Sequence, residues 1–150
     1  MPTLTTDAAP LAAAEVKELA ATWYKKLDVH APLVDLLPLV DEDAEMKFPE
    51  ATLRGKAEFE GWYERVIRVF FDEVHTLKSV DATPTKTGAD VKVVVHWEAS
   101  VWNPPAAKSQ RIKLDAYQTW KVRRSPITGE PVIATYIVDE LKYDAGSAKL

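Results

Sequence analysis

The chain contains no cysteine, which excludes disulfide frameworks, thiolate metal sites and a cysteine nucleophile. It has only three histidines, His30, His75 and His96, and no two of them have the i, i+4 spacing of a metal-binding motif. It also lacks a glycine-rich phosphate loop and a Gly-x-Ser-x-Gly elbow, the motifs of phosphoryl transfer and of serine hydrolases. We therefore expect neither a metal nor a cofactor.

Long apolar runs and concentrated basic charge are absent as well. No apolar stretch approaches the roughly 20 residues that a membrane-spanning helix needs, and residues 1–10 lack the basic and apolar regions of a signal peptide. The formal net charge is −4, and no basic stripe of the kind expected of a nucleic-acid-binding protein is visible. These observations predict a cytoplasmic protein that binds neither nucleic acid nor membranes.

What is present has the size and composition of one globular domain. The chain has 150 residues, of which 47% are hydrophobic and 28% are charged. We expect a single domain over residues 1–150, with flexible segments at 1–9 and 144–150.

The first half of the chain has the apolar period of helices. Two stripes with i, i+3, i+4 spacing predict two long helices with one buried face each: Val16, Leu19, Ala20, Trp23 and Leu27, then Phe59, Trp62, Tyr63, Val66 and Phe70. A short apolar helix over Leu33–Leu37 and a short strand around Met46–Phe48 lie between them.

The second half changes to the period-2 alternation of strands. Turn signals divide it into four long strands: Val74–Ala82, Asp90–Trp102, Gln110–Arg123 and Pro131–Tyr143. Helices followed by strands with short connections indicate an α+β fold. We expect a cone-shaped, curved antiparallel sheet with the three helices of the N-terminal half packed on its concave face.

This order of elements resembles the nuclear transport factor 2-like superfamily and, within it, the SnoaL-like polyketide cyclase branch. Four parts of the sequence carry the resemblance: Trp23-Tyr24-Lys25-Lys26-Leu27-Asp28, Leu36-Leu37-Pro38-Leu39 leading to Met46-Lys47-Phe48-Pro49, Arg54-Gly55-Lys56-Ala57-Glu58-Phe59, and Gln118-Thr119-Trp120 with Tyr136-Ile137-Val138-Asp139. The resemblance spans residues 11–143. It implies acid–base chemistry in a dry pocket, on a scaffold that also holds binding proteins without catalysis.

Asp139 is the first candidate catalytic residue. By alternation it shares an apolar face with Ile133, Ile137 and Leu141, where a lone carboxylate is costly unless it is paired or functional. The resemblance also implies an acid at this strand end. The alternative is a solvated or ion-paired Asp139 at the rim of the pocket.

His96, as acid or orienting partner, is the second candidate, and Glu98 shares its strand face. Periodicity alone directs Trp97 to the core and His96 outward. A five-residue connection over Asn103–Ala107 would reverse this, because Trp102 would then pair with Lys108. The sequence leaves both arrangements open, and a surface salt bridge is the alternative for His96 and Glu98.

Further candidates would line or support a binding pocket. The resemblance implies Tyr24, since ketosteroid isomerase-like members place an oxyanion-binding tyrosine on the first helix, and His75 begins a strand that could reach the pocket mouth. The remaining candidates are Trp23, His30, Trp62, Gln118 and Trp120. For His30 and His75 a satisfied structural histidine is the alternative, and for Tyr24 and the tryptophans it is plain packing in the core.

Together these features predict a SnoaL-like protein that binds a small apolar or aromatic carbonyl compound. The preferred function is that of a cofactor-independent lyase, isomerase or cyclase. A non-catalytic ligand-binding or dimerisation module on the same fold is the alternative. Because large apolar residues occupy both faces of the strand from Val91 to Val101, we also expect a homodimer formed through the convex sheet face.

Overall fold

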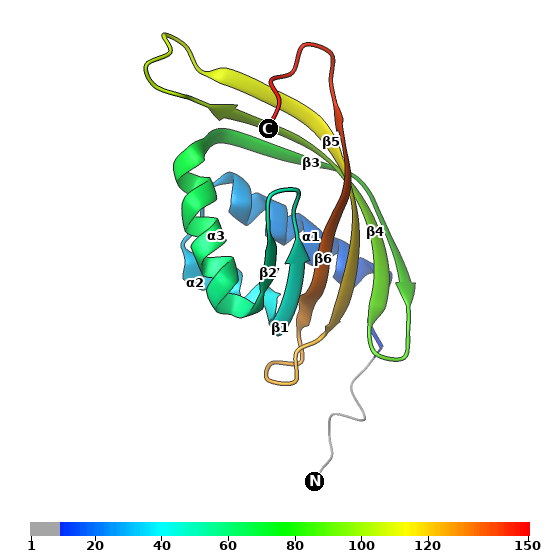
Figure 1. Ribbon diagram of the computed structural model, residues 1–150. Helices are drawn as coiled ribbons and strands as arrows, with labels where there is room; N and C mark the ends of the chain where they lie inside the picture. The colour runs from blue at the N-terminus through cyan, green and yellow to red at the C-terminus, as the bar shows by residue number, and fades with distance from the viewer. Residues whose placement is uncertain (1–9) are drawn as a thin grey trace.

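The computed structural model describes residues 10–150, so the expectation for residues 1–9 lies outside the described part of the chain. Figure 1 shows the helices against the inner side of a strongly curved sheet. The helices are α1 (Ala13–Asp28), α2 (Leu33–Leu36) and α3 (Gly55–Val69), and the 3-10 turn η2 (Leu37–Leu39) follows α2. The strands are β1 (Val40–Lys47), β2 (Thr52–Arg54), β3 (Phe70–Pro84), β4 (Ala89–Val101), β5 (Gln110–Arg124) and β6 (Pro131–Tyr143).

The six strands form one open sheet in the order β2-β1-β6-β5-β4-β3. The four long strands pair antiparallel in sequence order, which confirms the α+β architecture predicted above. β1 joins the edge of β6 in parallel, so the sheet is mixed. The short strand predicted around Met46 is therefore the one that links the helical half of the chain to the last strand.

Each of the two long helices begins where a glutamate side chain accepts a hydrogen bond from a free backbone donor. The Glu15 carboxylate accepts from the Ala12 N–H at the start of α1, and the Glu58 carboxylate accepts from the Arg54 N–H at the start of α3. The chain leaves α1 through His30 in a left-handed conformation, with a φ of 49°, and Pro32 precludes further helix in the same direction. None of the helices within residues 10–150 is long and apolar enough to cross a membrane.

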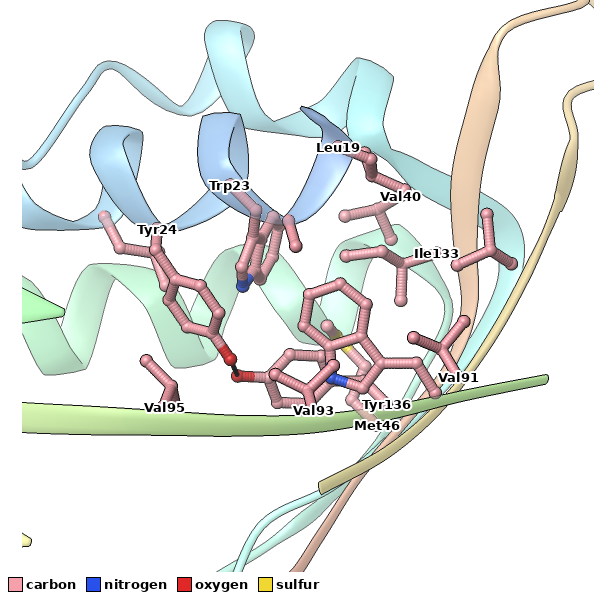
Figure 2. Packing of buried hydrophobic residues seen from close by; sticks show 14 of the residues in the cluster. Leu19, Trp23, Tyr24, Val40, Met46, Val91, Val93, Val95, Ile133 and Tyr136 are labelled. Atoms are coloured by element: carbon pink, nitrogen blue, oxygen red, sulfur yellow. Dashed lines mark hydrogen bonds between the residues drawn. The ribbon is translucent and has the colours of Figure 1, made fainter. Parts of the chain in front are cut away.

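The core lies between α1 and the concave sheet face (Figure 2). Trp23 of α1 and Trp120 of β5 are completely buried, and their rings pack against the same ring of Tyr136 on β6. This aromatic layer fills the space between α1 and the central strands β5 and β6. The space that remains lies between α3 and the beginning of β3.

The register between β4 and β5 settles the alternative that the sequence leaves open. Trp97 lies opposite Leu114 and His96 lies opposite Asp115, so Trp97 is on the concave face and His96 on the convex face. The connection between the paired residues runs from residue 102 to residue 109. This register is shifted by one residue from the Trp102–Lys108 pairing that would have turned His96 and Glu98 inward.

Candidate active site

A pocket of about 120 Å³ lies between α3, the start of β3 and the concave face of the sheet. Its walls come from both long helices, the four long strands and the turn after β1, and they are mostly apolar. The lining residues are Leu27, Phe48, Pro49, Glu50, Trp62, Tyr63, Val66, Ile67, Phe70, Glu73, His75, Val95, Trp97, Leu114, Ala116, Gln118, Val138, Leu141 and Leu150. The few polar groups among these walls are therefore the candidates for chemistry.

His75 at the start of β3 is held by Asp28 at the end of α1. Asp28 Oδ1 lies 2.5 Å from His75 Nδ1, and Asp28 Oδ2 accepts from the His75 backbone N–H at 2.9 Å. A carboxylate only accepts, so Nδ1 carries a proton, and in the neutral form of the ring the lone pair is on Nε2. Among the described residues, Nε2 has no hydrogen-bond partner and is not a fully buried atom, and His75 is part of the pocket lining. The pair thus presents an oriented base to an apolar space.

The ring of His75 is fixed from both sides. It stacks on Tyr24 at a centroid distance of 4.6 Å and faces Trp97 at 6.1 Å. With Asp28 holding one edge, the imidazole has little freedom to rotate away from the pocket. Preorganisation of this kind is what a general base requires.

Gln118 of β5 brings a hydrogen-bond donor to the same pocket. Its Oε1 accepts from Trp120 Nε1 at 2.8 Å and from the Tyr24 hydroxyl at 2.8 Å. An indole N–H can only donate, so this contact fixes the orientation of the amide and directs the –NH2 group away from Trp120. Gln118 is 5% exposed and lines the pocket, and in residues 10–150 its –NH2 group has no partner and is not sealed off.

Two tyrosines complete this network beneath the pocket. The Tyr24 and Tyr136 hydroxyls lie 3.0 Å apart, as the dashed line in Figure 2 shows. Burial raises the pKa of Tyr24 well above its ordinary value and raises the pKa of Tyr136 too. Both therefore remain neutral, and the oxyanion role that the resemblance implies for Tyr24 does not fit a hydroxyl that is occupied by Gln118 and Tyr136.

Glu73 lies two residues before His75 on the same strand face. Its Oε2 is 2.5 Å from His30 Nε2, and its Oε1 accepts from Trp97 Nε1 at 3.1 Å. The neighbouring Tyr63 hydroxyl donates instead to the Ala31 carbonyl at 2.6 Å. Burial, followed by the charge of Glu73, raises the pKa of Tyr63 to about 12, so that this hydroxyl stays protonated.

The structure brings part of the predicted set together. His75, Gln118 and Trp62 line the pocket. The predicted residues Tyr24, Trp23 and Trp120 are buried in the core and are not part of the pocket lining. His30 reaches the site only through Glu73.

His96 and Glu98 lie outside the pocket on the convex face. His96 Nδ1 contacts Asp115 at 2.8 Å and Nε2 contacts Glu98 at 3.1 Å. The hydrogen bond with Asp115 is the main reason why the pKa of His96 is raised, and the bond with His96 lowers the pKa of Glu98. This is the surface salt bridge that the sequence analysis kept as the alternative.

The expectation that Asp139 faces the pocket is wrong. Asp139 is exposed, and its carboxylate accepts from the Thr119 hydroxyl at 2.6 Å. Tyr117 pairs with Glu140 while Gln118 pairs with Val138, so Asp139 is an extra residue in a β-bulge. A second irregularity lies between Lys121 and Val122. Simple alternation along β6 fails because each bulge shifts the face on which the following residues lie.

Three residues of the site were not among the predicted ones: Asp28, Glu73 and Trp97. A signal for two of them was present in the sequence. Asp28 follows Tyr24 by four residues and so continues the buried face of α1. Glu73 and His75 are two apart at the start of a strand, which places them on one face.

The predicted loose segment after residue 143 also contributes to the site. The Asp144 and Ala148 backbone N–H groups donate to carbonyls of Lys113 and Arg111 on β5. Ser147 accepts from the Lys113 N–H through its hydroxyl. This path brings Leu150 to the pocket wall.

Solved structures with this fold carry different activities in their names. A provisionally named aromatic ring hydroxylase from Novosphingobium aromaticivorans is 14% identical, with 91% of this chain and 96% of that chain covered and a TM-score of 0.74. The hexachlorocyclohexane dehydrochlorinase LinA-type3 from Novosphingobium barchaimii LL02 is 15% identical, with 91% and 92% covered and a TM-score of 0.66. A ketosteroid isomerase-like protein from Erwinia carotovora atroseptica is 18% identical, with 89% and 96% covered and a TM-score of 0.67. At these identities the similarity shows the fold.

The sequence comparison is more specific about the family than about the activity. None of the curated proteins matches the chain significantly. The family model described as a SnoaL-like domain matches residues 20–129, which include the pocket walls from Leu27 to Gln118. The chain therefore belongs to the SnoaL-like domain family of the nuclear transport factor 2-like superfamily.

Proposed function

We propose that the protein is a cofactor-independent lyase or isomerase that removes a proton next to the carbonyl group of a small apolar or aromatic compound. The observation that carries the proposal is the Asp28–His75 pair, with Nε2 of His75 open to an apolar pocket. His75 is the general base. Asp28 holds the required tautomer and stabilises the imidazolium that forms.

Gln118 has a complementary role in this proposal. Proton removal next to a carbonyl places negative charge on the carbonyl oxygen, and the –NH2 group of Gln118 is a donor for that charge. The donor is preorganised, because Trp120 and Tyr24 hold the other end of the amide. A mostly apolar wall strengthens such an interaction by excluding water.

Deuterium exchange tests this function without knowledge of the natural substrate. Cyclohexanone in deuterated buffer exchanges its α-hydrogens whenever a base removes them, and NMR follows the loss of the α-proton signal. We expect His75→Gln to lower the protein-dependent rate by roughly 10²–10⁴-fold, and Asp28→Asn to lower it as well. His96→Gln, on the convex face, is the matched control and should retain the rate.

The same experiment separates this function from the binding module considered above. Binding of cyclohexanone with exchange no faster than in buffer would support the non-catalytic alternative. Equal losses in His75→Gln and His96→Gln would remove His75 from the mechanism.

We further propose that two copies of the chain associate through the convex sheet face. Val94 and Ile137 are half-buried apolar residues on this face, among the polar groups around His96. Light scattering at micromolar concentration should give twice the 16.8 kDa of one chain. The mass of a single chain would contradict the proposal.

A further inference from the structure

Glu73 is a carboxylate in a largely apolar wall. Its side chain is only 9% exposed, and burial of such a group is costly unless hydrogen bonds compensate. His30 supplies one donor and Trp97 the other, one to each oxygen. Because a carboxylate has about four acceptor positions, roughly half of its capacity is left unused.

No described side chain fills that remaining capacity. The nearest candidate is Tyr63, whose pKa reflects the charge of Glu73. Its hydroxyl, however, donates to the Ala31 carbonyl. Within residues 10–150, Glu73 is thus a pocket-lining acceptor that is supported on two sides and still able to accept from a bound molecule.

The size and walls of the pocket limit what that molecule is. An engineered cavity of about 150 Å³ holds one benzene molecule, and this pocket measures about 120 Å³. Its walls include the stacked rings of Phe48 and Trp62, 4.1 Å apart, and the edge-on pair of Phe70 and Trp97. The volume is of the order that one six-membered ring needs and leaves no room for a fused polycyclic compound.

We propose that Glu73 accepts a hydrogen bond from a ring hydroxyl, so that the substrate is a hydroxylated single-ring compound. The inference rests on the proposed function, because it assigns the substrate class of the same pocket. The hydroxyl of the substrate meets Glu73, and its carbonyl oxygen meets Gln118. The two groups have opposite hydrogen-bonding character, so together they select the orientation of the ring in front of His75.

Phenol and toluene are suitable probes, because they have the same number of heavy atoms and only phenol can donate. Calorimetric titration gives the ratio of their dissociation constants, and we expect the wild type to bind phenol about tenfold more tightly. Glu73→Gln keeps an acceptor for Trp97 but replaces a charged acceptor with a neutral one and should reduce that preference several-fold. Glu73→Leu should abolish it, and Glu73→Gln remains informative if the leucine variant does not fold. His96→Gln is the control and should keep the wild-type preference.

Failure of this inference differs from failure of the proposed function. An unchanged phenol preference in Glu73→Gln, or no preference in the wild type, overturns the role of Glu73 even if deuterium exchange still depends on His75. A phenol preference that survives in His75→Gln and is lost in Glu73→Gln supports it, whether or not the protein exchanges α-hydrogens.

Discussion

Replacement of Gln118 by methionine tests the amide orientation on which the donor role depends. Methionine matches glutamine in length but offers no strong acceptor to Trp120 Nε1 and to the Tyr24 hydroxyl. Both of these residues are buried, so that the indole N–H loses the one partner it has within residues 10–150, while Tyr24 keeps its contact with Tyr136. A buried donor without an acceptor costs about 1–3 kcal/mol. We expect a net loss of about 2 kcal/mol, which lowers the melting temperature by roughly 4–8 °C in a chain of this size.

A double-mutant cycle isolates the bond to Trp120. Trp120→Phe removes the indole donor, so Gln118→Met should cost less in that background by about 1 kcal/mol. Urea unfolding monitored by circular dichroism gives the four free energies of unfolding. Thr119→Val is the matched control, because Thr119 lies on the opposite sheet face and contacts Asp139. Its cost should be the same with either residue at position 120. If Gln118→Met and Trp120→Phe are additive to within about 0.3 kcal/mol, the amide does not accept from the indole and the argument for its –NH2 group fails.

Three further predictions concern other parts of the structure. His96→Gln should reduce stability more at about pH 5.5 than at pH 8.5. The pKa of His96 is raised in the folded state, so its stabilising effect is complete below the unfolded-state pKa of about 6.5 and is lost as the pH rises above the folded-state pKa. Equal losses in denaturation curves at both pH values would contradict this. Arg123→Met should lower the free energy of unfolding by roughly 2–3 kcal/mol, because it leaves the buried Asp41 without its two 2.8 Å hydrogen bonds from Arg123. Adding Asp41→Asn should recover part of this loss, measured as the melting temperature. Gly88→Ala should destabilise the protein by about 1–3 kcal/mol or more, because the new Cβ would lie 1.9 Å from the Val122 carbonyl oxygen. In Gly61→Ala, in α3, the new Cβ meets nothing nearer than 3.7 Å, and this variant should be more stable by about 0.5–1 kcal/mol. Similar melting temperatures for the two variants would refute the steric argument.

Most of the fold could be predicted because it depends on local periodicity. The apolar stripes of α1 and α3 and the alternation in β3 to β6 are properties of neighbouring residues. The site depends on pairings that local periodicity does not contain. Whether His96 or Trp97 faces inward is decided by the length of the β4–β5 connection, and the side of Asp139 is decided by a bulge.

The Asp28–His75 pair shows most clearly what local periodicity does not predict. Each residue is an ordinary member of its own segment, and 47 positions separate them in the chain. Only the crossing of α1 over the start of β3 makes one the hydrogen-bond partner of the other. Histidine and carboxylate residues were visible as candidates, but the sequence alone did not show which of them meet.

The parallel pairing of β1 with β6 has a consequence for the way the protein folds. β1 ends at Lys47, and its partner residues on β6 begin at Ile133. Likewise, 94 positions separate Tyr24 from Gln118 and 112 separate it from Tyr136. Contacts between such distant positions pay a large loop-closure entropy and slow folding. We expect the hairpins of β3 to β6 to form early and α1 to find its partner once β3 is available, while β1 remains without its parallel partner until β6 has been synthesised. During translation the apolar side chains of β1, and Tyr24 of α1, therefore wait for β5 and β6, which makes this part of the nascent chain the most dependent on protection from aggregation.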